Sequence, residues 1–271
     1  MKMLSIITVN RNNADGLRRT MESVLSQTYR DFEYVVVDGA STDGSLEVIK
    51  TMALERDVDV DGIQVHWLSE PDTGIYNAMN KGIRMAKGEY VLFLNSGDIL
   101  VNSSVVEQFM LSNSSADIVA CRERFSNDGV YIPPEKEDLS YDYLVDQPLM
   151  HQSTFIKKIA FDKYGLYNEN HRIVSDWEWW IKALVIGNAT YETHDFEVAL
   201  FDCNGVSNEG GIIRGVHDAE IAGVREYLLP RVDCMSIELR KLRAIVQEYE
   251  FLKKGKFGPI VRFILFLKRI K

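Results

Sequence analysis

The stretch GEYVLFLNSGD, residues 88–98, decides the fold, because an almost unbroken apolar run ends there in flexible polar residues and a carboxylate. Both faces of residues 90–94 are apolar, which is typical of a central parallel strand covered by helices on each side. Polar residues just past the carboxyl end of such a strand lie where open α/β sheets bind ligands. Residues 95–98 are therefore either a ligand site that includes Asp98 or a turn that caps the next helix.

The residues before this stretch repeat one pattern three times: a short apolar run, a polar loop, and apolar residues at helical spacing. The predicted strands cover residues 4–9, 32–37 and 63–68, and the predicted helices cover residues 17–25, 46–52 and 75–86. This alternation predicts a mostly parallel sheet with right-handed crossovers. The sequence has no Gly-x-Gly-x-x-Gly after the first strand and no P-loop motif, which argues against those two nucleotide sites.

Beyond residue 100 the alternation loosens, and the sequence predicts a mixed topology. The predicted elements are a helix at 105–111, a strand at 118–125, a hairpin at 128–129, a strand at 151–156, a helix from 175 to about 187, a strand at 190–201, and helices at 215–229 and 235–252.

The composition is that of an ordinary globular protein with one strongly basic end. The chain has 271 residues, of which 46% are hydrophobic and 26% charged, and its formal net charge is −9. Residues 251–271 hold seven Lys or Arg and no acid, which leaves 24 basic against 40 acidic residues, a charge of −16, in the remainder. An acidic body argues against nucleic-acid binding, whereas a basic, apolar-rich tail favours an anionic membrane surface.

The tail has an apolar segment over residues 259–267, far short of the roughly 20 residues needed to cross a bilayer. It is predicted either to lie in the membrane interface or to dock as a helix on the body or on a second copy. The widely spaced Cys121, Cys203 and Cys234 indicate reduced thiols and no structural zinc site. The first apolar run is too short for a secretory signal, so we expect a cytoplasmic protein, peripheral at the inner face of the plasma membrane.

Four blocks, in order along the chain, resemble the family-2 inverting glycosyltransferases with a GT-A fold, of the type that builds bacterial polysaccharides. They are IITVNR at 6–11, VVDGASTDG at 36–44, GIYNAMNKG at 74–82 and the stretch at 88–98. The resemblance implies an α/β GT-A domain over residues 1–205, with a mostly parallel central sheet flanked by helices. Its nucleotide-binding half is expected at 1–110 and its acceptor half at 111–205. A C-terminal helical extension is expected at 206–271, with the basic amphipathic tail at 251–271.

The resemblance also assigns residues to a nucleoside-diphosphate-sugar donor. The implied donor-binding residues are Thr8, Asn10, Arg11, Asp38, Asp72, Asn80, Lys81, Ser96 and Gly97. A carboxylate and main-chain groups at strand ends supply the fixed hydrogen-bond donors and acceptors that recognise the edge of a nucleobase. The alternative for Asp38 is a turn residue before a helix, and for Asp72, Asn80 and Lys81 it is a solvated loop and helix face.

In that family the last carboxylate after the fourth strand binds Mn²⁺ or Mg²⁺, which bridges the donor diphosphate. Here that residue is Asp98, because Asn95 and Gly97 stand where acids are common. Mg²⁺ tolerates one or two protein carboxylates when phosphate oxygens and water complete its shell. A divalent cation is therefore the expected cofactor.

An inverting transfer needs a base that takes the proton of the acceptor hydroxyl. Asp176 resembles the family's catalytic Asp at the start of a helix, with Glu178 as the reserve candidate; a plain helix N-cap is the alternative for Asp176. His151 lies in a segment that resembles the family's acceptor-side strand. Trp177 is the candidate for stacking on a sugar, although three neighbouring Trp residues cannot all face one way on a helix.

The sequence thus predicts an enzyme that moves a sugar from a nucleoside-diphosphate-sugar to a hydroxyl of a saccharide or lipid-linked saccharide. Synthesis of a cell-surface polysaccharide is the expected setting. The alternative is a catalytically weak nucleotide-sugar or membrane-binding module. It is favoured by the motif at residues 95–98, where Asn95 and Gly97 replace acids that are common in the family.

Overall fold

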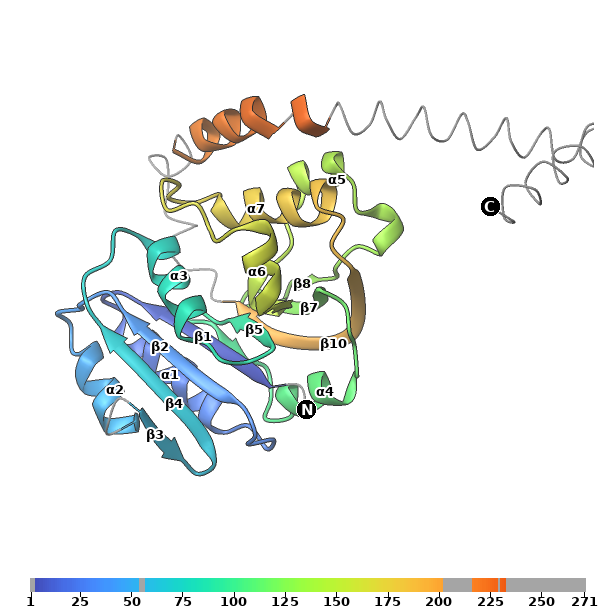
Figure 1. Ribbon diagram of the computed structural model, residues 1–271. Helices are drawn as coiled ribbons and strands as arrows, with labels where there is room; N and C mark the ends of the chain where they lie inside the picture. Colours follow the sequence, from blue (N-terminus) through green and yellow to red (C-terminus); the bar gives the residue numbers. More distant parts are fainter. Residues whose placement is uncertain (1–2, 54–56, 202–215, 229, 233–271) are drawn as a thin grey trace, which may run out of the picture. The chain divides into compact units, whose positions relative to one another are not determined.

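The computed structural model describes residues 3–53, 57–201, 216–228 and 230–232 (Figure 1). Residues 1–223 form one compact unit and residues 224–271 a second, and the sheet with its helices belongs to the first. Residues 216–228 are helical, as predicted. The predicted helix over 235–252, the basic tail, Cys203 and Cys234 lie outside the described residues. No helix in the described ranges is both long and apolar enough to cross a membrane.

The first half of the chain alternates strands and helices. Its elements are β1 (Leu4–Asn10), α1 (Ala14–Leu25), β2 (Glu33–Asp38), α2 (Ser45–Ala53), β3 (Asp57–Val60), β4 (Ile63–Ser69), α3 (Ile75–Met85), β5 (Tyr90–Phe93), β6 (Ile99–Leu100) and α4 (Val105–Leu111). The second half is mixed. Its elements are β7 (Ile118–Phe125), β8 (Val130–Tyr131), the 3₁₀ turn η1 (Lys136–Asp138), α5 (Tyr141–Asp146), the 3₁₀ turn η2 (His151–Ser153), β9 (Thr154–Lys157), α6 (Lys158–Tyr164), α7 (Ser175–Trp180), the π-helical turn η3 (Ile181–Ile186) and β10 (Tyr191–Phe201).

The strands form one sheet in the order β3-β4-β2-β1-β5-β9-β7-β10-β6, with β8 paired to β7. The predicted parallel core is confirmed, because β4, β2, β1 and β5 are parallel neighbours. The chain adds β2 and β4 on one side of β1 and then places β5 on the other side. This topological switch point, at the carboxyl ends of β1 and β5, is where open α/β sheets bind ligands.

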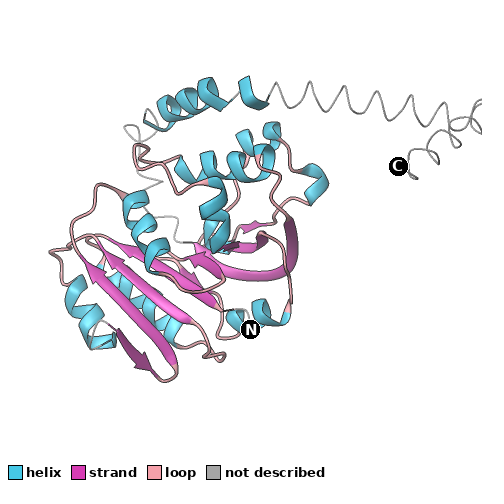
Figure 2. Cartoon of the chain, in the orientation of Figure 1, coloured by secondary structure: helices cyan, strands magenta, loops and turns pink. Residues whose placement is uncertain are grey.

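Helices cover both faces of the parallel strands, as Figure 2 shows. On one face, Leu17 of α1 and Ile49 of α2 join Ile6 of β1 in a single buried cluster. On the other face lies α3, whose Gly82 stands directly against Ile7 of β1. The seven residues of β1 are all buried, which explains why the strand is apolar on both faces.

The second half of the sheet is mixed, as predicted. Here β9 runs antiparallel to both β5 and β7, and β10 runs parallel to β7. The predicted strand over 151–156 is wrong in its first half, where His151–Ser153 form a 3₁₀ turn. The cause is local, because the backbone N–H of Ser153 and the hydroxyl of Thr154 both donate to the carbonyl of Met150. This turn projects His151 toward the switch point.

The close approach of α3 to β1 gives a stability prediction. In Gly82→Ala the new Cβ would lie 2.4 Å from Cγ2 of Ile7, so the helix must move. Such overpacking costs about 1–3 kcal/mol of unfolding free energy, measurable by urea denaturation. The control is Gly223→Ala, where no described atom lies within 4 Å of the added Cβ, so stability should hold or rise. Equal stability of the two variants would contradict this packing.

Candidate active site

The candidate site lies at the carboxyl ends of β1, β2 and β5. Asn10 ends β1, Asp38 ends β2, and the two residues are partners in the parallel register. The turn over residues 95–98 follows β5, which neighbours β1 on its other side. The fold therefore brings together three polar loops that are far apart in the sequence.

Asp38 is buried and accepts hydrogen bonds from residues at the end of β1 and in the loop after β2. Its Oδ1 accepts from the amide of Asn10 at 2.8 Å and the hydroxyl of Ser41 at 2.5 Å. Its Oδ2 accepts from the backbone N–H of Ser41 at 3.1 Å and the hydroxyl of Ser69 at 2.7 Å. Four accepted bonds use the capacity of a carboxylate. Asp38 thus shapes the loops that surround it.

Arg11 and Asp72 meet at the rim of the site. Nη1 of Arg11 lies 3.1 Å from Oδ1 of Asp72, and the Arg11 side chain is 61% exposed whereas that of Asp72 is 5% exposed. Oδ1 of Asp72 also accepts from the backbone N–H of Gly74. A Cβ on Gly39 would lie 2.1 Å from Oδ2 of Asp72, so a larger residue there would displace the Asp72 carboxylate. The guanidinium is held in place yet faces solvent, where an anionic or planar ligand can reach it.

Three predicted donor residues serve the framework of the protein. The Thr8 hydroxyl is fully buried, donates to the carbonyl of Leu94 and accepts from Tyr34. The Asn80 amide exchanges two hydrogen bonds with the backbone of Tyr167. These contacts pair the polar groups of Thr8 and Asn80 with groups of the protein itself. Nζ of Lys81 is bound to the carbonyl of Pro71 and the carboxylate of Glu70, both at 2.8 Å.

The turn that carries Asp98 is fixed by α1. Gly97 has φ of 113°, a conformation that favours glycine, and its N–H donates to the hydroxyl of Thr20 at 3.0 Å. The same hydroxyl donates to the carbonyl of Asp98 at 2.7 Å. The carbonyl of Ser96 accepts from the amide of Asn13 at 3.0 Å. Asp98, only 4% exposed, is therefore held on a rigid turn at the switch point.

Sequence reasoning missed Glu123, a fully buried acid on β7. Its Oε2 accepts from the Ser153 hydroxyl at 3.1 Å. Burial, together with the negative charge of Asp98, raises the pKa of Glu123 to about 8, so the carboxyl group is protonated at neutral pH. The signal was available, because Glu123 continues the buried face of Val119 and Cys121 along an alternating strand.

Asp98 shares its turn with Asn95, and its charge acts on Glu123. Oδ1 of Asn95 and Oε1 of Glu123 are buried and have no hydrogen-bond partner among the described residues. Across the described ranges, no three His, Cys, Asp or Glu side chains group closely enough to hold a metal ion alone. A single carboxylate beside oxygen acceptors fits Mg²⁺ or Mn²⁺ whose shell is completed by phosphate oxygens and water.

A hydrogen-bonded chain links this turn to Asp176, at the start of α7. The amide nitrogen of Asn95 lies 3.0 Å from Nε2 of His151, and Nδ1 of His151 lies 3.2 Å from Oδ2 of Asp176. Oδ1 of Asp176 accepts from the Tyr76 hydroxyl at 2.8 Å and from the backbone N–H of Trp177 at 2.9 Å. Because a carboxylate can only accept, Nδ1–H of His151 is the donor to Asp176.

Asp176 stays ionised although it is largely buried. Burial by itself would raise its pKa, but the hydrogen bond and charge of His151, with the bonds from Tyr76 and Trp177, lower the pKa below its usual value. Its side chain keeps 20% of its surface exposed. Asp176 therefore presents an accessible carboxylate that can accept a proton.

The structure gives two predicted residues next to Asp176 partners within the protein. Trp177 is buried and its indole N–H donates to the carbonyl of Leu144 at 2.6 Å; Trp179 and Trp180 are buried too. Glu178 points into an ion-paired cluster, with Lys182 Nζ at 2.5 Å and His171 Nε2 at 3.1 Å. Helical periodicity placed both residues correctly on a helix but could not distinguish its buried faces from the exposed one.

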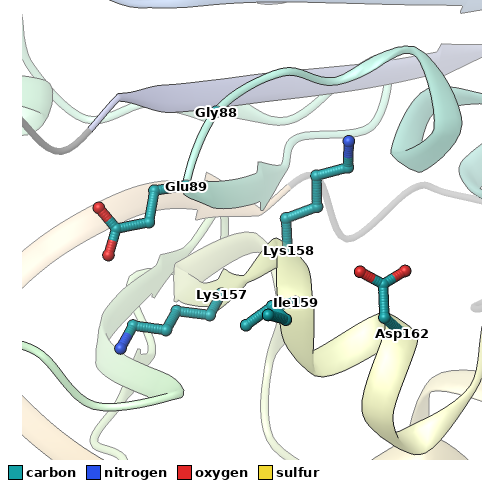
Figure 3. A pocket seen from close by; sticks show the side chains of 6 residues that line it. All are labelled: Gly88, Glu89, Lys157, Lys158, Ile159 and Asp162. Carbon is teal, nitrogen blue, oxygen red and sulfur yellow. The ribbon is translucent and has the colours of Figure 1, made fainter.

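A shallow pocket of about 390 Å³ lies elsewhere on the sheet (Figure 3). It is lined by Gly88, Glu89, Lys157, Lys158, Ile159 and Asp162. Both lysine ammonium groups donate to backbone carbonyls, those of Ser115 and Ala86. Gly88 and Glu89 precede β5, so this pocket is at the amino end of the strand whose carboxyl end leads to Asp98. It is separate from the candidate site.

Comparison with known proteins decides the family. The model of "Glycosyl transferase family 2" matches residues 5–166, more than half of the chain. The chain belongs to this family. As a family-2 glycosyltransferase it is similar to a "PGL/p-HBAD biosynthesis glycosyltransferase" of Mycobacterium bovis (strain BCG / Pasteur 1173P2), with 30% identity over 226 residues, 80% of this chain and 82% of that one.

Two solved structures show the same fold and confirm the predicted GT-A class of this glycosyltransferase. S. aureus TarS 1–349 in complex with UDP-GlcNAc aligns with a TM-score of 0.61 at 19% identity over 79% of this chain; the match spans 61% of that longer chain. The mannosyltransferase PcManGT from Pyrobaculum calidifontis, in complex with GDP-Man and Mn²⁺, aligns with a TM-score of 0.57 at 16% identity over 96% of this chain and 83% of that one.

Proposed function

We propose that this glycosyltransferase inverts the anomeric centre as it moves a sugar from a nucleoside-diphosphate-sugar to an acceptor hydroxyl. One observation carries the proposal. Hydrogen bonds from Asn95 to His151 and from His151 to Asp176 connect the turn that carries Asp98 to the ionised, partly exposed carboxylate of Asp176. A base held at a fixed position beside the donor site is what attack from the face opposite the leaving group requires.

The donor is proposed to bind at the carboxyl ends of β1, β2 and β5. Asp38 and Asn10 hold the loops there, Arg11 with Asp72 forms the rim, and the Ser96–Gly97 turn brings backbone close to the diphosphate. Support comes from the buried network of Asp38 and from the neighbours named above, which were solved with UDP-GlcNAc or GDP-Man. Thr8 and Asn80 are left out of this set, because their side chains bind the framework.

Asp98 is proposed to hold a divalent cation, with Asn95 and Glu123 as oxygen neighbours. Such an ion would supply charge neutralisation on the departing nucleoside diphosphate. The protein holds the nearly buried carboxylate of Asp98 in a fixed position, on a turn that hydrogen bonds to Thr20 stabilise. A neutral Glu123 beside Asp98 avoids adding a second negative charge there before a cation arrives.

The acceptor hydroxyl is proposed to bind at Asp176, whose side chain keeps 20% of its surface exposed. A saccharide or a lipid-linked saccharide fits this role, and the relative named for PGL/p-HBAD biosynthesis supports a glycoconjugate setting. In this proposal the basic tail, residues 251–271, brings the enzyme to an anionic membrane surface. The alternative function is a binding module with little turnover. It is favoured by the motif after β5, which keeps only one carboxylate, that of Asp98.

A pair of variants separates the two candidate bases. In Asp176→Asn, turnover should fall about 10²- to 10⁴-fold, because the proton acceptor is lost, while donor binding stays. In Glu178→Gln, turnover should persist, and the free energy of unfolding should fall by about 1–3 kcal/mol, because the contacts to Lys182 and His171 weaken. The measurement is kcat with a donor chosen by thermal-shift screening of nucleotide-sugars. Near-normal kcat in Asp176→Asn would refute the proposed base.

A second prediction concerns the cation. In Asp98→Asn, binding of Mn²⁺ in the presence of the nucleoside diphosphate, followed by titration calorimetry, should weaken by about 10²-fold or more, because the one fixed carboxylate is gone. Asp162→Asn is the matched control, since Asp162 lines the pocket at the amino end of β5. Unchanged Mn²⁺ affinity in Asp98→Asn would show that the cation does not bind at this turn.

A further inference from the structure

Glu220 forms hydrogen bonds with residues 172–174, the segment that leads into α7. It lies in the helix over residues 216–228, beyond residues 5–166 that the family model matches. Its Oε1 accepts from the backbone N–H of Arg172 at 2.6 Å, and its Oε2 accepts from those of Ile173 at 3.0 Å and Val174 at 3.3 Å. One carboxylate therefore satisfies three consecutive loop amides, and hydrogen bonds to an ionised acceptor are stronger than neutral ones.

The same segment is held from its other side by α3. The Tyr76 hydroxyl has one proton, which it shares between the carbonyl of Ile173 and Oδ1 of Asp176, the latter at 2.8 Å. The backbone N–H of Glu178 donates to the carbonyl of Val174, so the segment continues directly into α7. Only Ser175 separates the residues that Glu220 holds from Asp176. The position of the Asp176 carboxylate thus depends on a loop clamped between Glu220 and Tyr76.

We infer that Glu220 is a positioning residue for the catalytic base, which gives residues 216–223, in the same compact unit as the sheet, a part in sugar transfer. The inference rests on the proposed role of Asp176. Without the Glu220 carboxylate, three amides lose their partner and residues 172–174 can move, which carries Asp176 away from His151 and Tyr76. A displacement of about 1 Å at a reacting group costs up to about 10²-fold in rate. The donor loops at β1, β2 and β5 do not contain this segment, so donor binding should not change.

The test measures kcat, KM for the donor and donor affinity on the full chain. In Glu220→Ala, kcat should fall about 10- to 100-fold with donor KM and affinity unchanged. Glu220→Gln should give a smaller loss, because its amide oxygen keeps part of the acceptor capacity. The matched control is Glu226→Ala, an exposed acid in the same helix, which should leave kcat unchanged.

A double-mutant cycle separates positioning of the base from general support of the fold. If Glu220 acts through Asp176, then adding Glu220→Ala to Asp176→Asn should cost little further rate, because no base is left to position. The full 10- to 100-fold loss in the Asp176→Asn background would overturn the inference. A parallel loss of donor affinity and thermal stability in both Glu220 variants would overturn it as well. Near-normal kcat in Asp176→Asn alone would instead refute the proposed function, so the two failures are distinguishable.

Discussion

The proposed transfer chemistry depends on the pair of hydrogen bonds that His151 makes, one to Asn95 and one to Asp176. These two residues come from different parts of the fold, one after the central strand β5 and the other at the start of α7. A single imidazole spans them at 3.0 Å and 3.2 Å. It supplies part of what keeps Asp176 ionised against the cost of burial. Loss of this bridge would leave a carboxylate without its main partner and without a fixed distance to the donor side.

Other hydrogen bonds also fix the positions of polar groups at the switch point. Asp38 ties the ends of β1, β2 and β4 together, and Thr20 pins the turn of Gly97 and Asp98. Their donors and acceptors are bound before any ligand arrives, so less conformational entropy is lost when one binds. The exposed guanidinium of Arg11 and the partly exposed carboxylate of Asp176 remain at the surface of this framework.

Much of the fold was predictable from sequence, because buried parallel strands are apolar on both faces and end in polar loops. Strands β1, β2, β4, β5 and β7 and helix α4 were predicted within about one residue of their bounds. The short edge strand β3 and helix α6 were missed; α6 begins at Lys158 directly after β9 ends at Lys157, so no polar loop marks its start. The turn at His151 was assigned to a strand, because its deciding bonds to Met150 are local and leave no periodic signal.

The site was predictable as a set of loops but less so as a set of side chains. Asp98 and Asp176 lie where the motifs placed them, whereas Thr8, Asn80, Trp177 and Glu178 turned out to contact the framework. Motif spacing fixes which strand end a residue occupies, but not whether its side chain faces the opening or the core. Glu220 escaped notice for the complementary reason, because its contacts with residues 172–174 are tertiary and leave no motif in the sequence.

The central claim is that Asp176 activates a hydroxyl for attack from the face opposite the leaving group. The most direct measurement is the anomeric configuration of the first-formed product, read from the one-bond C1–H1 coupling constant by NMR. The acceptor is a saccharide found by screening with the donor that the enzyme turns over. The account predicts a product whose anomeric configuration is opposite to that of the donor. A product that keeps the donor's configuration would contradict a single displacement with Asp176 as base.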